Sequence, residues 1–176
     1  MPRFVVLTGL PASGKSTIGR HLSDALMLPM LDKDEILEGL FADHGVGDSA
    51  HRNALSRMAD MELETRAMTL PGAILVSWWR HPGSSVESGT PIGWLQSLQP
   101  NLVELHCRCC AEVACERFFA RARHPGHLDG VRDRAKELAR FRAFAALGPV
   151  VLGKVVEVDT ELPLDIDRLI RAIAEA

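Results

Sequence analysis

The sequence lacks features that mark several classes of protein. No apolar run reaches 18 residues, so the pattern predicts no membrane-spanning helix. The first apolar segment begins at residue 3, which leaves no room for a secretory signal, and we expect a cytoplasmic protein without a membrane partner. The formal net charge of −3 gives no general basic excess, which argues against nucleic acid as a partner.

Cysteine is scarce, and its surroundings do not suit a metal. The four cysteines cluster at Cys107, Cys109, Cys110 and Cys115, and no paired histidines accompany them, as a zinc site would require. We therefore expect free thiols, buried or half-buried, at these positions.

What the sequence does contain is an alternation of apolar runs and helical patterns. The runs are apolar throughout, as in parallel strands buried on both faces, and they lie at 3–8, 28–31, 73–77, 102–107 and 154–159. Helical patterns lie near 15–27, 34–42, 50–70, 91–98, 111–123, 131–146 and 165–175. This order predicts a single α/β domain over residues 1–176, with a five-stranded parallel sheet and helices on both faces.

The loop after the first predicted strand reads GLPASGKST and fits the phosphate-binding pattern G-x-x-x-x-G-K-[ST]. Gly9 and Gly14 let the backbone approach an anion closely, and the helix that follows adds its positive end. Lys15 is expected to reach the β- and γ-phosphates of a nucleotide, and Ser16 to bind Mg²⁺. A glycine-rich turn with a chance lysine is the alternative, and the strand–loop–helix context argues against it. The loop residues predicted to bind the nucleotide are Gly9, Pro11, Ala12, Ser13, Gly14, Lys15, Ser16 and Thr17.

Two aspartates flank Lys33 directly after the second predicted strand. Residues two apart in an extended segment face the same side, so Asp32 and Asp34 can both point at the phosphate loop. Phosphoryl transfer to an alcohol needs an acid near Mg²⁺ and an acceptor for the hydroxyl proton. We assign the first role to Asp32 and the second to Asp34. The alternative for Asp34 is a structural role as the N-cap of the next helix, which does not exclude catalysis.

A segment rich in arginine follows the fourth predicted strand. Arg117 and Arg121 are four residues apart at the end of a predicted helix, and Arg123 follows before the break at Pro125. Guanidinium groups suit phosphate oxygens, so residues 117–134 are predicted to form a lid. The alternative is a solvated basic face, in which the charges are balanced by Asp129, Asp133 and Glu137.

These motifs resemble those of the small P-loop kinases, the group of the shikimate, gluconate and nucleoside-monophosphate kinases with the chloramphenicol phosphotransferases and zeta-toxin kinases. The similarity rests on GLPASGKST, LDKDE, RFFAR and VEVDT in this order, and it covers most of the chain as an order of elements. The resemblance implies a P-loop NTPase fold with ATP and Mg²⁺ as cofactors. It also implies that Arg117 packs on adenine and that Arg121 or Arg123 meets the transferring phosphate. By the same resemblance, Asp159 and Thr160 border adenine.

The sequence departs from related nucleotide-binding families at several places. The third strand ends in Ser77, where a Walker B strand carries an aspartate, which argues against the ATPase and GTPase machines. No N-K-x-D guanine-reading motif is present, so ATP is preferred over GTP. Polynucleotide and zeta-toxin kinases often carry an arginine three residues after the acid, whereas Leu37 stands three residues after Asp34. The gluconate kinase pattern is also missing, so specificity for sugar acids does not transfer.

Candidates for the acceptor site lie on both sides of the third strand. Trp78, Trp79 and Arg80 leave this strand at the face where an acceptor would lie. We expect one tryptophan in the core and the other against the acceptor, and assign Trp79 and Arg80 to the site; two core tryptophans are the alternative. Arg52 and Arg57 lie on the predicted helix before the strand, and at five residues apart they do not share a helix face. We assign Arg52 to the acceptor site.

Together these features predict an ATP-dependent phosphotransferase that moves the γ-phosphate to a hydroxyl of a small metabolite or antibiotic-like acceptor. The predicted catalytic residues are Lys15, Asp34, Arg121 and Arg123. The predicted acceptor-binding residues are Asp34, Arg52, Trp79 and Arg80, and the predicted metal-binding residues are Ser16 and Asp32. The alternatives are a kinase of polynucleotide 5′-hydroxyls, a zeta-toxin-like kinase, and a nucleotide-binding ATPase switch.

Overall fold

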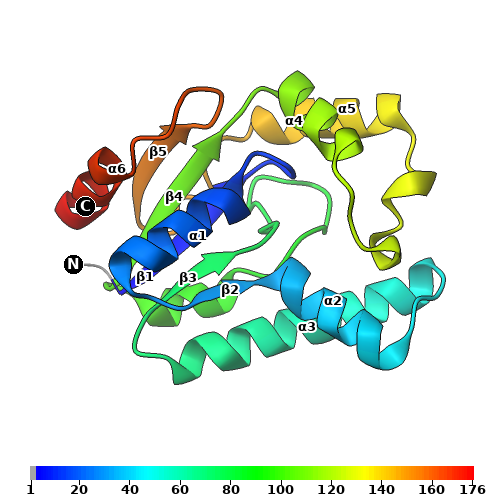
Figure 1. Ribbon diagram of the computed structural model, residues 1–176, viewed down its shortest axis with the longest axis horizontal. Helices are drawn as coiled ribbons and strands as arrows, with labels where there is room; N and C mark the ends of the chain where they lie inside the picture. The colour runs from blue at the N-terminus through cyan, green and yellow to red at the C-terminus, as the bar shows by residue number, and fades with distance from the viewer. Residues whose placement is uncertain (1–2) are drawn as a thin grey trace.

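The computed structural model describes residues 3–176 and confirms an α/β P-loop NTPase fold (Figure 1). Over this range the sheet has five strands, all parallel, in the order β2-β3-β1-β4-β5. The strands are β1 (Phe4–Gly9), β2 (Met30–Asp32), β3 (Ala73–Val76), β4 (Leu102–Arg108) and β5 (Lys154–Asp159). The α-helices are α1 (Lys15–Leu26), α2 (Lys33–His44), α3 (Ser49–Thr69), α4 (Ala111–Ala120), α5 (Arg134–Ala145) and α6 (Ile166–Glu175). Short 3₁₀ helices are η1 (Gly93–Leu98), η2 (Pro125–His127) and η3 (Asp129–Val131).

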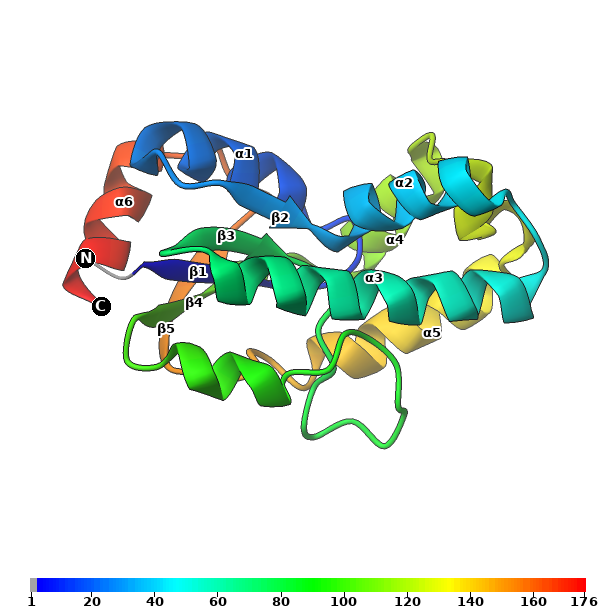
Figure 2. The ribbon, with the colours of Figure 1, turned by 90° about the horizontal axis from the view of Figure 1, so that it is seen from below.

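Helices cover both faces of the sheet, which explains why the central strands are apolar throughout. In β1 successive side chains alternate between faces, so that Phe4 and Val6 join one core and Val5 and Leu7 the other. The first core is closed by α2, α3 and η1, and the second by α1 and α6 (Figure 2). A third cluster joins α4 to α5 around Phe118 and Phe141.

The helices at the lid begin and end differently from the sequence prediction. The helix predicted over 111–123 ends at Ala120, and Arg121 is already extended, with φ −81° and ψ 142°. The helix predicted over 131–146 begins at Arg134, because the Asp133 side chain accepts the N–H of Lys136 at 2.8 Å and caps it there. Arg121 and Arg123 therefore lie on irregular backbone between α4 and α5, not on a helix. The predicted helix over 91–98 is the 3₁₀ helix η1.

The carboxyl ends of the strands point toward α2 and the α4–α5 pair (Figure 1). In an open parallel sheet this is the edge at which ligands bind. All four cysteines are free, as predicted, although Cys110 is exposed. Within residues 3–176, no group of three or more His, Cys, Asp or Glu side chains is placed to hold a metal ion, and no helix is long and apolar enough to cross a membrane.

Candidate active site

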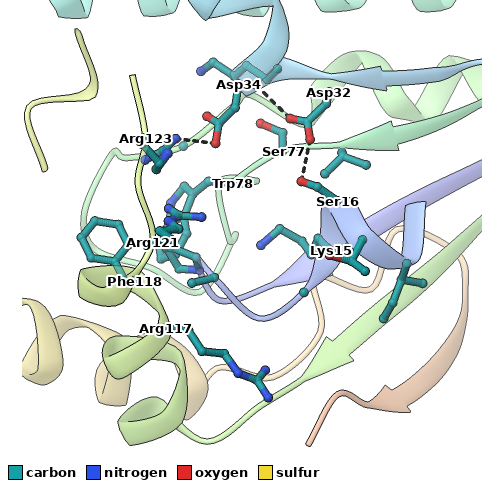
Figure 3. A pocket seen from close by; sticks show the side chains of 18 of the residues that line it. Lys15, Ser16, Asp32, Asp34, Ser77, Trp78, Arg117, Phe118, Arg121 and Arg123 are labelled. Carbon is teal, nitrogen blue, oxygen red and sulfur yellow. Dashed lines mark hydrogen bonds and ion pairs between the residues drawn. The ribbon is translucent and has the colours of Figure 1, made fainter. Parts of the chain in front are cut away.

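A cavity of about 630 Å³ lies at this edge of the sheet, between the phosphate loop, α2, α3 and the lid (Figure 3). Most residues that the sequence analysis assigned to a site line it. They are Pro11, Ala12, Gly14, Lys15, Ser16, Thr17, Asp32, Asp34, Arg52, Arg117, Arg121, Arg123 and Thr160. The fold thus brings the phosphate loop, the acid pair and the lid arginines to one cavity.

The phosphate loop is shaped by two glycines and leads into a helix whose first N–H groups are open. Gly9 and Gly14 have φ values of 126° and 93°. A Cβ on Gly9 would lie 2.3 Å from the carbonyl oxygen of Cys107, so only glycine fits there. Gly14 is the N-cap of α1, and no side chain among residues 3–176 caps this end; the first turn also carries no acid. The N–H groups of the first turn can therefore bind an anion such as phosphate.

Lys15 is folded back onto its own loop and buried. Its Nζ donates hydrogen bonds to the carbonyl oxygens of Gly9 and Leu10, at 3.0 Å and 2.5 Å. Burial lowers the pKa of the Lys15 ammonium from 10.5 to about 8. The side chain is thus held beside the phosphate loop in a form whose charge a phosphate would stabilise.

The Ser16 hydroxyl at the start of α1 and the Asp32 carboxylate at the end of β2 are hydrogen-bonded to each other. The Ser16 hydroxyl donates to Asp32 Oδ2 at 2.6 Å, and Asp32 Oδ1 accepts the N–H of Asp34 at 2.9 Å (Figure 3). Burial raises the pKa of the Asp32 carboxyl, and the hydrogen bond from Ser16 opposes this effect. Mg²⁺ takes oxygen ligands, usually one or two from the protein with the rest from water and phosphates. The Ser16 hydroxyl and the Asp32 carboxylate are oxygen ligands of this kind and therefore suit Mg²⁺.

Asp34 lies in the first turn of α2, and its carboxylate accepts a hydrogen bond from Arg123 of the lid (Figure 3). The N-cap of α2 is Asp32, so the alternative role of Asp34 as that cap is wrong. Burial raises the pKa of the Asp34 carboxyl, but Arg123 and other cationic neighbours outweigh it and leave the pKa below its ordinary value. Asp34 is therefore ionised at neutral pH and can accept a hydrogen bond from a hydroxyl.

Three arginines of the lid region alternate with three carboxylates in a chain of ion pairs. In order, its members are Asp34, Arg123, Asp129, Arg132, Glu137 and Arg140. Asp129 lies 2.9 Å from Arg123 and 3.3 Å from Arg132, and Arg132 lies 3.2 Å from Glu137. The predicted balance by Asp129 and Glu137 is thus found inside the cavity wall and not on a solvated face, whereas Asp133 caps α5.

Three arginines of the cavity stand outside this chain of ion pairs: Arg117, which donates to the Thr160 carbonyl oxygen at 3.2 Å, Arg52 and Arg121. Arg52 and Arg121 form no ion pair with a carboxylate in the part of the chain that the structure describes. The Arg121 guanidinium lies 5.0 Å from the ring centre of Phe118, and Arg52 donates to Asn53 Oδ1 at 3.3 Å. Burial lowers the pKa of both guanidinium groups, and neighbouring arginines lower it further. Both are positive charges open to an anionic ligand.

The tip of the lid is docked on α2. His127 is fully buried, and its Nε2 lies 2.9 Å from Oε1 of Glu38. Phe41 stacks on the ring of His124 and meets His127 edge-on, with ring centres 5.2 Å and 5.6 Å apart. Gly126 packs so closely that a Cβ there would lie 2.5 Å from the Phe41 ring. The predicted lid segment therefore reaches across the cavity and contacts α2.

The structure exchanges the roles expected of the two tryptophans. Trp79 is buried among the core of α3 and η1, and its Nε1 donates to the carbonyl oxygen of Leu7 at 2.8 Å. Trp78 lines the cavity instead (Figure 3). The assignment of Trp79 to the acceptor is thus corrected, because side chains alternate where the chain leaves β3 and the second of the two tryptophans turns inward.

Several other predicted residues lie beside the cavity without lining it. Gly9 and Ser13 belong to the phosphate loop but do not line the cavity, and Ser13 is fully buried. Asp159 pairs with Arg108 at 3.1 Å and accepts the N–H of Glu161, so only its neighbour Thr160 reaches the cavity. Arg80 does not line the cavity either. Its backbone N–H pairs with Thr90 at 2.9 Å.

Sequence reasoning missed part of the wall. Ser56 of α3 and the Ser88-Gly89 segment line the cavity, as do Phe118 and Arg140. Ser56 follows Arg52 by one helical turn, a spacing that could have identified it. Ser88 and Gly89 lie in a loop without a motif, and only the fold brings this loop to the site.

Comparisons with known proteins support the fold and do not identify the molecule that accepts the phosphate. No family model matches the chain. Short stretches match curated shikimate kinases: 59% identity over 32 residues for that of Paracidovorax citrulli, and 59% over 35 residues for that of Corynebacterium glutamicum. The aligned part is 18% of this chain and 18% of the first relative, and 20% and 21% for the second. The chain thus matches about a fifth of the length of these relatives.

Solved structures match over nearly the whole chain. A provisionally assigned kinase from Chloroflexus aurantiacus is 26% identical, with a TM-score of 0.79, and the alignment covers 99% of this chain and 97% of that one. Shikimate kinase from Acinetobacter baumannii, solved in complex with shikimate, is 14% identical with a TM-score of 0.59 and covers 99% and 94%. The chain has the fold of the small P-loop kinases, and the predicted resemblance to this group is confirmed.

Proposed function

We propose that this protein is an ATP- and Mg²⁺-dependent phosphotransferase that moves the γ-phosphate to a hydroxyl of a small acceptor. One observation supports it above others: Lys15, Asp34 and Arg121 line a single cavity. A phosphate loop alone serves many nucleotide-binding proteins. A carboxylate facing that loop, with a cation from a lid, is the arrangement that transfer to an alcohol requires.

The nucleotide half of the cavity has a residue for each part of ATP. The open N–H groups of α1 and Lys15 would hold the phosphates, and Ser16 with Asp32 would hold Mg²⁺ and its water shell. ATP supplies the phosphoryl group, and Mg²⁺ offsets its charge. Arg117 donates to the carbonyl oxygen of Thr160 at 3.2 Å, and these two residues form the wall against which the base would pack.

Ion pairing distinguishes the two lid arginines. Arg123 is held by Asp34 and Asp129, while Arg121 has no carboxylate partner within residues 3–176. Arg121 is therefore the arginine we assign to the transferring phosphate, where it would stabilise the developing negative charge. Arg123 controls access to Asp34.

The acceptor half is formed by Asp34, Arg52 and Trp78. Asp34 would accept a hydrogen bond from the reacting hydroxyl and orient it toward the phosphate loop. Arg52 is an uncompensated cation on α3, suited to an anionic group on the acceptor. The acceptor is therefore a small hydroxylated molecule that carries a negative charge.

Acceptor-dependent release of ADP tests this function. The protein with ATP and Mg²⁺ is supplied with a panel of small hydroxylated acids that includes shikimate, and with an RNA oligonucleotide bearing a 5′-hydroxyl. We expect turnover that requires one of the small acids and is lost in Lys15→Ala. Labelling of the RNA end, or ATP hydrolysis that no small acceptor stimulates, would contradict the proposal.

A further inference from the structure

Two of the buried donors in the cavity wall that have no hydrogen-bond partner belong to uncharged side chains; the others are the Nε atoms of Arg52, Arg121, Arg132 and Arg140. Trp78 Nε1 and Ser88 Oγ are both inaccessible to solvent, and neither finds an acceptor within residues 3–176. Both residues line the cavity. Buried polar groups in folded proteins are nearly all paired, so an unpaired one beside a cavity points to a partner supplied by a ligand.

The two donors belong to adjoining and well-fixed parts of the wall. A Cβ on Gly89 would lie 2.5 Å from Trp78 Cδ1, the ring carbon bonded to Nε1. The N–H of Thr90 donates to the Trp78 carbonyl at 2.7 Å, and the hydroxyls of Ser77 and Thr90 lie 2.6 Å apart. The segment that carries Ser88 is therefore fixed along the pyrrole edge of Trp78.

The faces of the Trp78 ring are already occupied. Phe144 meets the ring edge-on, with ring centres 4.6 Å apart, and the Arg140 guanidinium lies 5.2 Å from the ring centre. A ligand stacked on Trp78 would have to displace these groups. What Trp78 still offers a ligand is its N–H.

Most buried groups without a hydrogen-bond partner around the cavity are donors, and the carboxylate oxygens of Asp60 and Asp129 that lack one lie in ion pairs. Arg52 Nε is another buried donor without a hydrogen-bond partner, whereas the nearby carboxylates are engaged in ion pairs. The same holds for Asp60, which Lys33 binds at 2.6 Å. A wall with free donors and occupied acceptors is complementary to oxygen atoms that accept hydrogen bonds.

We propose that Trp78 and Ser88 are specificity-determining residues, which donate hydrogen bonds to an oxygen of the acceptor molecule away from its reacting hydroxyl. This inference rests on the proposed function and adds the chemistry of the far end of the substrate. That end carries carboxylate, carbonyl or other acceptor oxygens, and an acceptor that ends in an alkyl or amino group is excluded. Such groups would leave both donors unpaired, which is how sites of this kind reject an analogue.

A first experiment measures the melting temperature of the ligand-free protein. Ser88→Ala removes a buried hydroxyl that has no partner, so the melting temperature stays unchanged or rises by up to about 4 °C. Ser84→Ala is the matched control, because the Ser84 hydroxyl in the same loop accepts the N–H of Val86 at 3.1 Å and is exposed. A larger fall for Ser88→Ala than for Ser84→Ala would show that Ser88 has a structural partner and would overturn the proposal.

A second experiment measures steady-state kinetics with the hydroxy acid of the panel that is turned over fastest. Ser88→Ala and Trp78→Phe should each raise the KM for the acceptor about tenfold, the loss expected for one hydrogen bond to a charged oxygen, with the KM for ATP unchanged. Trp94→Phe is the control for Trp78→Phe, since Trp94 packs against Trp79 and does not line the cavity. Unchanged acceptor KM in both variants would refute the proposal.

The two experiments separate failure of this inference from failure of the proposed function. If no acceptor supports turnover by the unaltered protein, the proposed function is wrong. The melting temperatures still decide whether the Ser88 hydroxyl is unpaired in the fold. If turnover is found and the acceptor KM values do not move, the function stands and the role of Trp78 and Ser88 is wrong.

Discussion

Arg123 of the lid is bound to the carboxylate of Asp34 on α2, and Asp129 holds the same guanidinium from its other side at 2.9 Å. The carboxylate expected to receive the acceptor hydroxyl is therefore paired with a cation through Oδ2 in the free protein, while its side chain stays half-exposed. If Asp34 binds the acceptor as proposed, a hydroxyl at Oδ2 would compete with Arg123, which keeps Asp129 as a partner when it leaves. On the proposed function, docking of the lid and binding of the acceptor would thus be linked through Arg123.

Asp34→Asn should retain ATP affinity and lose phosphoryl transfer. Asparagine keeps the shape of the side chain but cannot take the proton of the hydroxyl, and loss of a general base typically costs roughly 10²–10⁴-fold in rate. Calorimetry of ATP binding and transfer assays at varied Mg²⁺ measure the two effects. Asp32→Asn is the comparison, since asparagine still caps α2 while the variant should require more Mg²⁺. Normal transfer by Asp34→Asn would place the base elsewhere.

ATP affinity should fall as the pH rises past about 8, where Lys15 titrates in the free protein. Bound phosphate stabilises the ammonium and raises its pKa, so binding near this pH takes up a proton. Calorimetry in buffers of different ionisation enthalpy measures that uptake, and Lys15→Met should abolish it. The same shift has a consequence for folding. An unfolded lysine holds its proton up to pH 10.5, so this group makes the free protein more stable as the pH rises from about 8 toward 10.5. An affinity that is constant from pH 7 to about 9.5 would contradict the assignment.

Arg123→Gln should raise the pKa of the Asp34 carboxyl toward its ordinary value of 3.8. Because the folded pKa is lowered, ionised Asp34 stabilises the fold above pH 3.8, and this stabilisation is lost as the pH falls through the folded value. The variant should therefore lose free energy of unfolding at neutral pH, about 1 kcal/mol for a pair whose carboxylate is half-exposed, and depend less on pH below 3.8. Urea unfolding at pH 2.5–7, together with NMR of the carboxyl carbon, gives both quantities. Arg57→Gln, on the exposed side of α3, should leave the Asp34 pKa unchanged.

Gly126→Ala should release the lid from α2. The new methyl group would lie 2.5 Å from the Phe41 ring, and overpacking of this kind costs about 1–3 kcal/mol. Hydrogen exchange across residues 121–132 should become faster in this variant. Gly130→Ala is a matched control in the same segment, because a Cβ at Gly130 meets no atom within 4 Å among the described residues. Equal exchange in the two variants would show that the contact with Phe41 does not hold the lid.

Local patterns identified the strands and the phosphate-binding residues because these depend on neighbours in the chain. The loop needs glycine where φ is positive at Gly9 and Gly14, and a lysine and a hydroxyl at fixed positions after them. Buried parallel strands need continuous apolar runs, since each face packs on helices. Five strands, their order along the chain and the phosphate loop were therefore readable from the sequence, with ends that shifted by two residues at most.

Contacts between distant segments were decided only by the tertiary structure. The sequence offered Asp34 as a cap or a base, and the cap proved to be Asp32, a choice that depends on the backbone at the end of β2. The sequence analysis assigned Trp79 to the acceptor site, and this was wrong, because the direction in which the chain leaves β3 sent Trp79 into the core. The pairing of Arg123 with Asp34 joins residues 89 positions apart, and no spacing in the chain encodes it. Side-chain charge and periodicity are properties of a segment, whereas which charges meet is a property of the packed whole.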